Sequence, residues 1–451
     1  MPKRPNLIWI FGDQHRAQAL SCNGDVNAHT PNIDRLAVDG MSFTQAVAGC
    51  PLSCPYRGSL LSSQYPHNAV PGHEYPLPPQ TKTIAHAFKD AGYHTAWFGK
   101  WHVDGWHERD GRGALHRILP ERRGGFDQWL GYENNNAQWD CWVHGHDAAG
   151  KEIEHHRLPG FETDMLTGLF IEHLRQRVQR QEGQGDAAQP FFAALSVQPP
   201  HDPYVAPAPW MGKYNPAAIA LRPNVPAIPR IVEQARRELA GYYAMIENLD
   251  HNLGRIVAAL HELGITQDTH VLFFSDHGDM HGSQGQFRKT SPWEESIRVP
   301  FVMGGPSRYG TLTGRRTVPI NHVDVAPTSL GLCGIDKPLW MAGYDYSGHR
   351  IHGRKRDNEP DSAFLQLVEP TRHGNSIDRA WRGVVTRDGW KYVCLEGQPW
   401  LMFNLSEDPY EQANLAHNTA FTAERKRLHD RLAQWISDTG DEFALPTLHA
   451  K

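Results

Sequence analysis

Short apolar runs that end near an acidic residue constrain this chain more than any other feature of its sequence. Residues 6–11 (NLIWIF) form one continuous apolar run, and Asp13 follows it after a glycine. Residues 270–274 (HVLFF) form a second run, which Asp276 follows after a serine. Such runs are typical of strands buried on both faces of a parallel sheet. Because ligands collect at the carboxyl ends of these strands, we expect Asp13 and Asp276 to be neighbours.

Helical and strand-like segments alternate along most of the chain. The residue patterns predict helices at 29–37, 83–91, 168–179 and 231–263, and further strands at 95–98 and 191–197. Repeated strand and helix units indicate an α/β fold with one large, mostly parallel, doubly wound sheet flanked by helices. We expect this large domain to span residues 1–361.

The residues after position 361 change character. Three short strands are predicted at 381–386, 390–395 and 400–405, joined by turn-rich segments, and a helix follows at 422–437. We expect residues 362–451 to form a smaller α+β subdomain, a short antiparallel sheet plus a helix. Residues 104–124, rich in Arg, Gly and His, are predicted to form a long loop near the functional site.

Charge and composition exclude several classes of protein. The net charge is −5 and the basic residues are scattered, so we expect neither a nucleic-acid partner nor binding to an anionic membrane. No stretch reaches the roughly 20 apolar residues of a membrane span, and the N-terminal apolar run is too short for a secretory signal. The six cysteines lack zinc-type CxxC pairs, which suits a reducing compartment. As given, the chain reads as cytoplasmic, and a removed leader would make it periplasmic or secreted. Whether it forms an oligomer stays open.

The run at residues 50–66 (CPLSCPYRGSLLSSQYP) is the most informative motif. Its second half is apolar at helical spacing, so Ser53 is predicted to lie at or just before a helix N-terminus. Backbone N–H groups and the helix dipole favour an anion there. The plainer interpretation, a serine that merely caps the helix, fits this run alone equally well.

Ser53, Pro55 and Arg57 resemble the signature of the formylglycine-dependent type I sulfatases, a family of the alkaline phosphatase superfamily. In that family a Cys or Ser begins a C/S-x-P-x-R run that directs its oxidation to formylglycine. Neither Cys50 nor Cys54 has proline and arginine at these offsets, so Ser53 fits the register. Further motifs resemble the family in order along the chain: FGKWH at 98–102, PPHDP at 199–203, SDHGD at 275–279, Lys289 with Glu294 and Glu295, RVP at 298–300 and NLSEDP at 404–409.

The resemblance implies one divalent metal, calcium in related sulfatases, held by Asp13, Gln14, Ser53 in its modified form, Asp276 and His277. Many relatives carry a second Asp where this chain has Gln14, and Asn where it has His277. An imidazole ligand suits manganese or zinc better than calcium, so Mn²⁺ and Zn²⁺ stay open beside Ca²⁺. Gln14 could instead hydrogen-bond to one of the metal ligands without contacting the metal itself. His277 could merely cap its loop.

The resemblance also implies the catalytic residues: Ser53, Arg57, Lys100, His102, His201 and Lys289. Residue 53 would become a hydrated aldehyde, of which one hydroxyl attacks sulfur while the alcohol departs and the other then expels sulfate. Arg57 would activate this hydrate, and Lys100 and Lys289 would bind the sulfate oxygens. His102 and His201 would assist the hydrate and protonate the leaving alcohol. A formylglycine-generating maturation enzyme is the implied partner.

Three weaker candidates for substrate contact are Asn135, His281 and Trp101. Asn135 lies in an asparagine cluster, which is more often a turn. His281 closely follows the motif that contains Asp276. Trp101 belongs to a set of tryptophans that could stack on a sugar, although aromatic residues more often belong to the core.

Together these features predict a sulfatase that hydrolyses a small-molecule or oligosaccharide sulfate ester, with a sulfated sugar slightly preferred. Phosphonate monoester or phosphodiester hydrolases are the closest alternative, because these relatives share the fold, the formylglycine and a similar Asp-Gln and Asp-His metal set. A non-catalytic binder of sulfated glycans is the alternative from another class, since an unmodified serine is a poor nucleophile. Three origins of Ser53 stay open. It could be a native serine that a maturation enzyme converts to formylglycine, or a serine introduced in place of a native cysteine. It could also be a serine that is never modified, in a protein that only binds.

Overall fold

One large mixed sheet organises the part of the chain that the computed structural model describes, residues 3–184, 188–372 and 379–448. Its strands lie in the order β10-β2-β9-β8-β1-β7-β3-β4-β5-β6. They are β1 (Asn6–Gly12), β2 (Met41–Phe43), β3 (His94–Lys100), β4 (Gln128–Tyr132), β5 (Trp142–His146), β6 (Glu152–Arg157), β7 (Phe191–Ser196), β8 (Thr269–Ser275), β9 (Phe301–Gly304) and β10 (Gly314–Arg316).

The centre of this sheet is parallel and its outer parts are mixed. Strands β8, β1, β7, β3 and β4 run parallel to one another. The pairs β8–β9, β9–β2, β4–β5 and β5–β6 are antiparallel. The predicted α/β fold with one large sheet is therefore confirmed, and its parallel arrangement holds in the middle, where the strand ends matter for the site.

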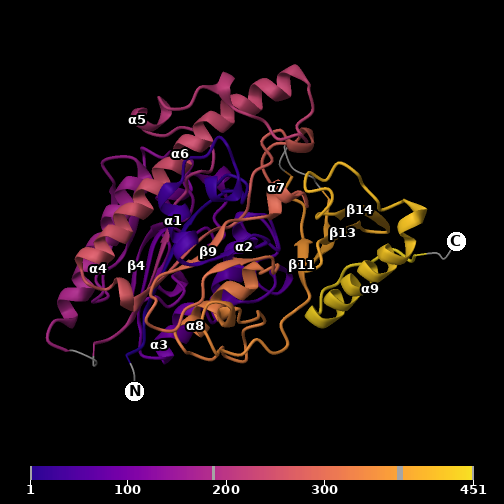
Figure 1. Cartoon of the computed structure of the whole chain (residues 1–451). Helices are drawn as coiled ribbons and strands as arrows, with labels where there is room; N and C mark the ends of the chain where they lie inside the picture. The colour runs from indigo at the N-terminus through magenta and orange to yellow at the C-terminus, as the bar shows by residue number, and fades with distance from the viewer. Residues whose placement is uncertain (1–2, 185–187, 373–378, 449–451) are drawn as a thin grey trace.

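Helices cover both faces of the sheet (Figure 1). Two apolar cores, one on each face, hold these helices in place. The first face carries α1 (Pro31–Asp39), α4 (Glu162–Gln181) and α6 (Pro229–Glu262), and the second carries α2 (Ser53–Ser62), α3 (Ile84–Asp90) and α8 (Val325–Leu332). Two short helices lie in connecting segments, α5 (Ala208–Met211) and α7 (Glu294–Ile297).

Strand β1 shows why the apolar runs are continuous. Leu7, Trp9 and Phe11 point into the core beneath α2, α3 and α8. Ile8 and Ile10 point into the core beneath α1, α4 and α6. Since successive side chains of a strand alternate between faces, a strand covered on both sides must be apolar at every position.

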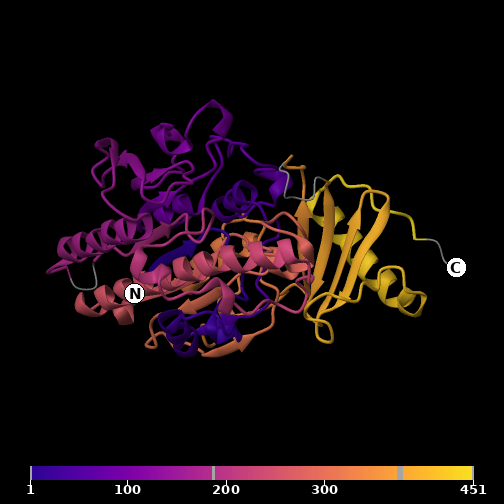
Figure 2. The same ribbon diagram turned by 90° about the horizontal axis from the view of Figure 1, so that it is seen from above.

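A second, smaller sheet lies beside the large one and is drawn in orange and yellow in Figure 2. It is antiparallel, with β11 (Ser362–Leu367), β12 (Trp381–Thr386), β13 (Trp390–Leu395) and β14 (Gln398–Asn404) in sequence order, and α9 (Thr422–Thr439) packs on it. The predicted small antiparallel sheet with a C-terminal helix is confirmed, and β11 adds a strand that the sequence did not predict. The face of the small sheet opposite α9 packs on the part of the chain that contains the large sheet, at Val47, Cys50, Leu52 and Ile297.

The central strands direct polar residues to a single edge of the large sheet. Asp13 directly follows β1, Asp276 directly follows β8, and Lys100 and Ser196 end β3 and β7. This edge holds the candidate site. Within the described residues, none of the helices combines the length and the apolar character that a membrane span requires.

Candidate active site

Asp13, Asp276 and His277 form a buried cluster at the carboxyl ends of β1 and β8. One ligating atom from each lies within 4.8 Å of the others, and all three side chains are fully buried. The predicted proximity of Asp13 and Asp276 is therefore confirmed, across more than 260 positions in sequence. His277 Nε2 lies 3.4 Å from Asp13 and 3.7 Å from Asp276, so the imidazole faces both carboxylates.

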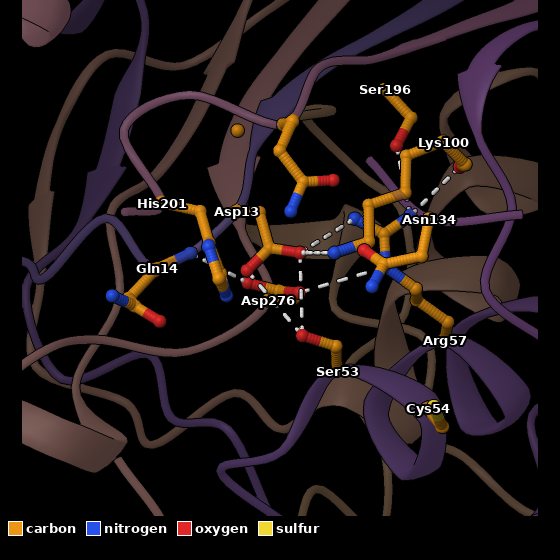
Figure 3. Close-up of polar contacts among 12 residues, drawn as sticks. Asp13, Gln14, Ser53, Cys54, Arg57, Lys100, Asn134, Ser196, His201 and Asp276 are labelled. Carbon is orange, nitrogen blue, oxygen red and sulfur yellow. Dashed lines mark hydrogen bonds and ion pairs between the residues drawn. The ribbon is translucent and has the colours of Figure 1, made fainter. Parts of the chain in front are cut away.

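Ser53 is the first residue of α2 and points at this cluster (Figure 3). Its Oγ lies 2.9 Å from His277 Nε2 and 3.3 Å from Asp13 Oδ2. Cys54, the next residue, points away from the cluster in the same view. The N-terminus of a helix favours an anion, so Ser53 lies between acidic ligand atoms on one side and a partial positive charge on the other.

Arg57 lies one helical turn after Ser53, so that both side chains share the face of α2 that meets the cluster. Its Nη1 donates to Lys100 O at 2.9 Å and to Ser196 Oγ at 2.8 Å. Its Nη2 lies 3.4 Å from Asp13 Oδ2, and its Nε lies 3.6 Å from Asp276 Oδ2. A planar guanidinium can make all these contacts at once, which a lysine could not.

Buried cations hold Asp13 in its ionised form. Burial alone would raise the pKa of Asp13, but nearby positive charge, which includes Lys100 and Arg57, brings it well below its ordinary value. Lys100 Nζ lies 2.5 Å from Asp13 Oδ2 and is itself fully buried. Burial lowers the pKa of Lys100, and the charge of Asp13 opposes that shift.

The donor set of this cluster fits a divalent cation. Among the described residues, none donates a hydrogen bond to Asp276 Oδ2, although that atom is buried. Arg57 Nε lies 3.6 Å from this oxygen without a hydrogen bond, and a bound divalent cation would satisfy the oxygen directly. Two carboxylates and an imidazole are ligands that calcium, manganese or zinc accept, and the imidazole favours the last two.

The Gln14 side chain points away from this cluster (Figure 3). Its Oε1 accepts from Lys289 Nζ at 2.6 Å, and its Nε2 donates to Asp279 at 2.7 Å. Its backbone N–H donates to Asp276 Oδ1 at 2.9 Å. In this arrangement Gln14 acts as a hydrogen-bonder that links the cluster to Lys289, and joining the ligand set would require its side chain to rotate.

His201 and Lys289 form a second group beside the cluster. Lys289 Nζ donates to His201 Nε2 at 2.9 Å, and His201 Nδ1 lies 2.8 Å from Asp202 O. Burial, followed by the charge of Lys289, lowers the pKa of His201 to about 4. A neutral ring with its hydrogen on Nδ1 satisfies both hydrogen bonds.

His102 lies just beyond β3, close to Lys100. Burial, followed by the charge of Lys100, brings its pKa well below its ordinary value, so the ring is neutral. Its φ of +59° lies in the left-handed region, as do those of Gln14 (+69°) and Thr290 (+77°). Such conformations cost free energy in non-glycine residues and gather at functional sites.

A cavity of about 660 Å³ brings Ser53, His102, His201 and Lys289 together. The segment predicted to be a long loop near the site contributes His107, Glu108 and Arg109 to its wall. Further lining residues are Leu52, His73, Glu74, Asn134, Asn136, Asp202, Arg288 and Thr371. Sequence reasoning did not single out these further residues, although the asparagine cluster contains Asn134 and Asn136 and the motif at 199–203 contains Asp202.

Three residues predicted to contact substrate are not among the described residues that line this cavity: Asn135, His281 and Trp101. Trp101 is 1% exposed and packs against Trp97, Trp129 and Phe126, so its ring cannot stack on a sugar. His281 is fully buried, with its ring 4.3 Å from that of Tyr242. Asn135 donates to Ala137 O in a local turn, which is the plainer interpretation of the asparagine cluster.

Comparison with known proteins decides the family. A family model described as Sulfatase matches residues 5–335, which is most of the chain. The chain belongs to the sulfatase family. A second model, described as N-sulphoglucosamine sulphohydrolase, C-terminal, matches residues 282–438. As a sulfatase, the protein is an enzyme of the sulfuric ester hydrolase class.

Named sulfatases resemble this chain over nearly its whole length. An ulvan-active sulfatase of Formosa agariphila is 32% identical, with 98% of this chain and 83% of the relative covered. An endo-4-O-sulfatase of Bacteroides thetaiotaomicron is 31% identical over 92% of this chain and 88% of the relative.

Solved structures share the fold. A structure reported for glycosaminoglycan metabolism by Bacteroides thetaiotaomicron has a TM-score of 0.83, 26% identity and 97% coverage of both chains. The phosphonate monoester hydrolase of Agrobacterium radiobacter has a TM-score of 0.76, with 97% of this chain and 96% of that chain covered. At 22% identity, the second likeness concerns the fold alone.

Proposed function

We propose that this sulfatase hydrolyses the sulfate ester of a sugar, with residue 53 acting as a formylglycine hydrate. The observation that carries the proposal is the position of Ser53. Its Oγ lies at the wall of the cavity, 2.9 Å from His277 and 3.3 Å from Asp13, with the cations Arg57 and Lys100 bound to the same carboxylate. An oxygen nucleophile placed there meets the positive groups that an anionic ester needs.

Asp13, Asp276, His277 and residue 53 would hold one divalent cation, with Gln14 joining them if its side chain rotates. Calcium is the expected ion, and the imidazole of His277 leaves manganese and zinc as alternatives. Bound there, the cation would supply Lewis acidity beside the sulfate oxygens and residue 53.

The chain's own residues would then carry the reaction. One hydroxyl of the hydrated residue 53 gives up its proton and its oxygen bonds to sulfur, while the ester S–O bond breaks and the alcohol takes a proton. The second hydroxyl then loses its proton, the aldehyde C=O forms again, and sulfate leaves. Lys100 and Lys289 would neutralise the sulfate oxygens, and Arg57 would stabilise the hydrate.

His102 and His201 would move the protons. Both rings are neutral in the free protein because burial lowers their pKa values. A neutral imidazole can accept a proton from the hydrate, and an anionic sulfate beside it favours the protonated form that returns the proton to the leaving alcohol.

The size and lining of the cavity support a sugar as the alcohol. About 660 Å³ accommodates a sugar ring, and Asn134, Asn136, Arg109 and Arg288 bring hydrogen-bonding groups to its wall. Two of the similar sulfatases have names that refer to ulvan and to an endo-4-O activity. A sulfated oligosaccharide is therefore the substrate class that we propose.

A phosphonate monoester is the second candidate substrate. It is favoured by Gln14 and His277, which stand where many sulfatases carry Asp and Asn. Turnover of nitrophenyl sulfate and of a phenyl phosphonate by the same matured preparation would separate the two. We expect kcat/KM for the sulfate to exceed that for the phosphonate, and the reverse order would assign the chain to the phosphonate hydrolases.

The proposal is tested by the mass of the peptide that contains residue 53. Co-expression with a formylglycine-generating maturation enzyme, the partner that the proposal requires, should remove two hydrogens from Ser53 and yield sulfatase activity. The Ser53→Ala variant should show neither. Unmodified serine in an inactive preparation would favour the non-catalytic glycan binder, although such a binder has little need for His102, His201 and Lys289 around one oxygen.

A further inference from the structure

A second group of metal-ligating side chains lies on the other side of Ser53. Cys54, His73 and His102 each place one ligating atom within 4.8 Å of the other two. Cys54 Sγ lies 4.0 Å from His73 Nδ1. Cys54 and His102 are buried, and His73 is partly exposed to the cavity that holds Ser53.

The proposed reaction explains neither Cys54 nor the unpaired Nδ1 atom of His102. The register of the modification motif excludes Cys54, and its side chain points away from Asp13 and Asp276 (Figure 3). His102 is 5% exposed, yet its Nδ1 has no hydrogen-bond partner among the described residues. A buried ring nitrogen without a partner is unfavourable unless a ligand satisfies it.

The distances suit a tetrahedral metal that accepts sulfur. Zinc lies about 2.3 Å from a thiolate sulfur and about 2.0–2.1 Å from an imidazole nitrogen, so a tetrahedral angle places the two ligand atoms ~3.6 Å apart. The observed 4.0 Å between Cys54 and His73 requires a small contraction. Three protein ligands leave a fourth position open, and His73 and His102 both face the cavity.

Glu74 lies beside His73, on the side of the ring that faces away from Cys54. Its Oε1 lies 3.6 Å from His73 Nε2, the ring nitrogen opposite the one that faces Cys54. A carboxylate close to the distal nitrogen of a histidine is a usual companion of metal-bound imidazole, and a small shift of the His73 ring would bring Glu74 within hydrogen-bond distance. Burial raises the pKa of the Cys54 thiol to about 12, and the backbone N–H of Glu74, which donates to Cys54 Sγ at 3.4 Å, opposes part of this rise, as a bound cation would.

The geometry points to a second metal site, formed by Cys54, His73 and His102, that binds a thiophilic divalent cation such as Zn²⁺. Binding breaks the S–H bond of Cys54, forms an S–Zn bond and releases one proton to solvent. The bound ion would engage a ring nitrogen of His102 and would narrow the cavity beside Ser53. Zinc would therefore inhibit the enzyme from a site separate from the Asp13–Asp276–His277 cluster, and this last consequence rests on the proposed function.

Cobalt tests the site without any need for activity, because a cobalt–thiolate bond produces a charge-transfer absorption that oxygen and nitrogen ligands do not. The full-length protein, with Ser53 unmodified and with excess Ca²⁺ at the first site, is titrated with Co²⁺. We expect this absorption to saturate at one equivalent. A wild-type protein that shows no such absorption would overturn the assignment.

Variants identify the ligands. Cys54→Ser should abolish the absorption, and His73→Gln should weaken Co²⁺ binding at least tenfold, with thermal unfolding used to confirm that both proteins are folded. Cys22→Ser is the matched control, because Cys22 is a partly exposed cysteine outside this group, and it should leave the absorption unchanged. Persistence of the absorption in Cys54→Ser would refute the site.

Inhibition is measured separately on the matured enzyme. Zn²⁺ should lower sulfatase activity reversibly, and Cys54→Ser should need at least tenfold more Zn²⁺ for the same loss. Equal sensitivity would place the inhibitory zinc elsewhere and overturn the inhibitory role. If the wild-type enzyme hydrolyses no sulfate ester, the proposed function fails, while the cobalt titration still decides whether the metal site exists.

Discussion

Lys289 Nζ lies 2.9 Å from Nε2 of His201, although 88 positions separate the two residues. The same ammonium group also donates to Gln14 Oε1 at 2.6 Å. One cation therefore connects the imidazole proposed to move protons with the loop that carries Asp13. Lys289 therefore lowers the pKa of His201 together with burial, and we propose that it also offers a charge to the substrate.

The first prediction concerns that charge. Burial and then Lys289 lower the pKa of His201 to about 4, so Lys289→Ala should raise it. If the neutral ring is the active form, the acidic limb of the kcat/KM profile should move to higher pH, and kcat/KM should fall ~10²-fold because a sulfate contact is lost. Lys289→Arg keeps the charge and should leave the limb in place. If the acidic limb of the kcat/KM profile is unchanged in Lys289→Ala, the protonation of His201 does not control the reaction.

The second prediction concerns the Asp13–Asp276–His277 cluster. Asp276→Ala removes one of its two carboxylates and should weaken Ca²⁺ binding by at least ~10²-fold, measured by calorimetry. Asp202→Asn is the control, since Asp202 lines the cavity but does not belong to the cluster. Equal calcium affinity in wild type and Asp276→Ala would show that the cation binds elsewhere.

The third prediction concerns the junction between the two sheets. Lys391 is fully buried, with its Nζ 2.9 Å from Glu294 Oε1 and 2.6 Å from Glu411 Oε2. Lys391→Met would leave Glu411 without this cation and Glu294 with Arg298 alone, and we expect a loss of about 3–5 kcal/mol in the free energy of unfolding, measured in urea.

An exposed ion pair provides the control for this junction. Lys426 lies 2.6 Å from Asp430 on the surface of α9. Lys426→Met should change the free energy of unfolding by no more than about 0.5 kcal/mol. Equal losses in the two variants would show that burial does not strengthen the Lys391 pair.

The fourth prediction concerns Gly99, which lies next to Lys100 at the end of β3. Its φ is +98°, and an added Cβ would lie 1.9 Å from Ser196 O. Gly99→Ala should therefore combine a backbone cost of about 1–2 kcal/mol with a packing cost of about 1–3 kcal/mol. Gly92→Ala has a φ of +87° but open space around its Cβ, so it should show the backbone cost alone. Thermal unfolding of the two variants measures the difference.

Much of the fold could be predicted because it depends on local patterns. Runs buried on both faces identified β1, β7 and β8, and helical spacing identified α4 and α6. The three-residue strands β2 and β10 are too short to show a period, and their pairing depends on distant segments. The division of the chain at residue 361 stays a prediction, as do the roles of the individual site residues.

The candidate site was predictable in position but not in side-chain orientation. Strand ends and the motif around Ser53 predicted which residues would meet, because the parallel centre of the sheet brings those ends together. Nothing in the sequence shows that Gln14 turns toward Lys289 or that Trp101 packs against Trp97. These orientations depend on contacts with segments far away in sequence.

The packing of the small sheet on Cys50 and Leu52 also has a consequence for biosynthesis. Synthesis of strands β11–β14 ends roughly 350 residues after Ser53, which at about 5–20 residues per second is an interval of roughly 20–70 s. Until then the apolar surface beside Ser53 has no cover. We therefore expect the nascent chain to leave residue 53, the nucleophile of the proposed reaction, accessible to other proteins for tens of seconds, and the last fifth of translation to close that access.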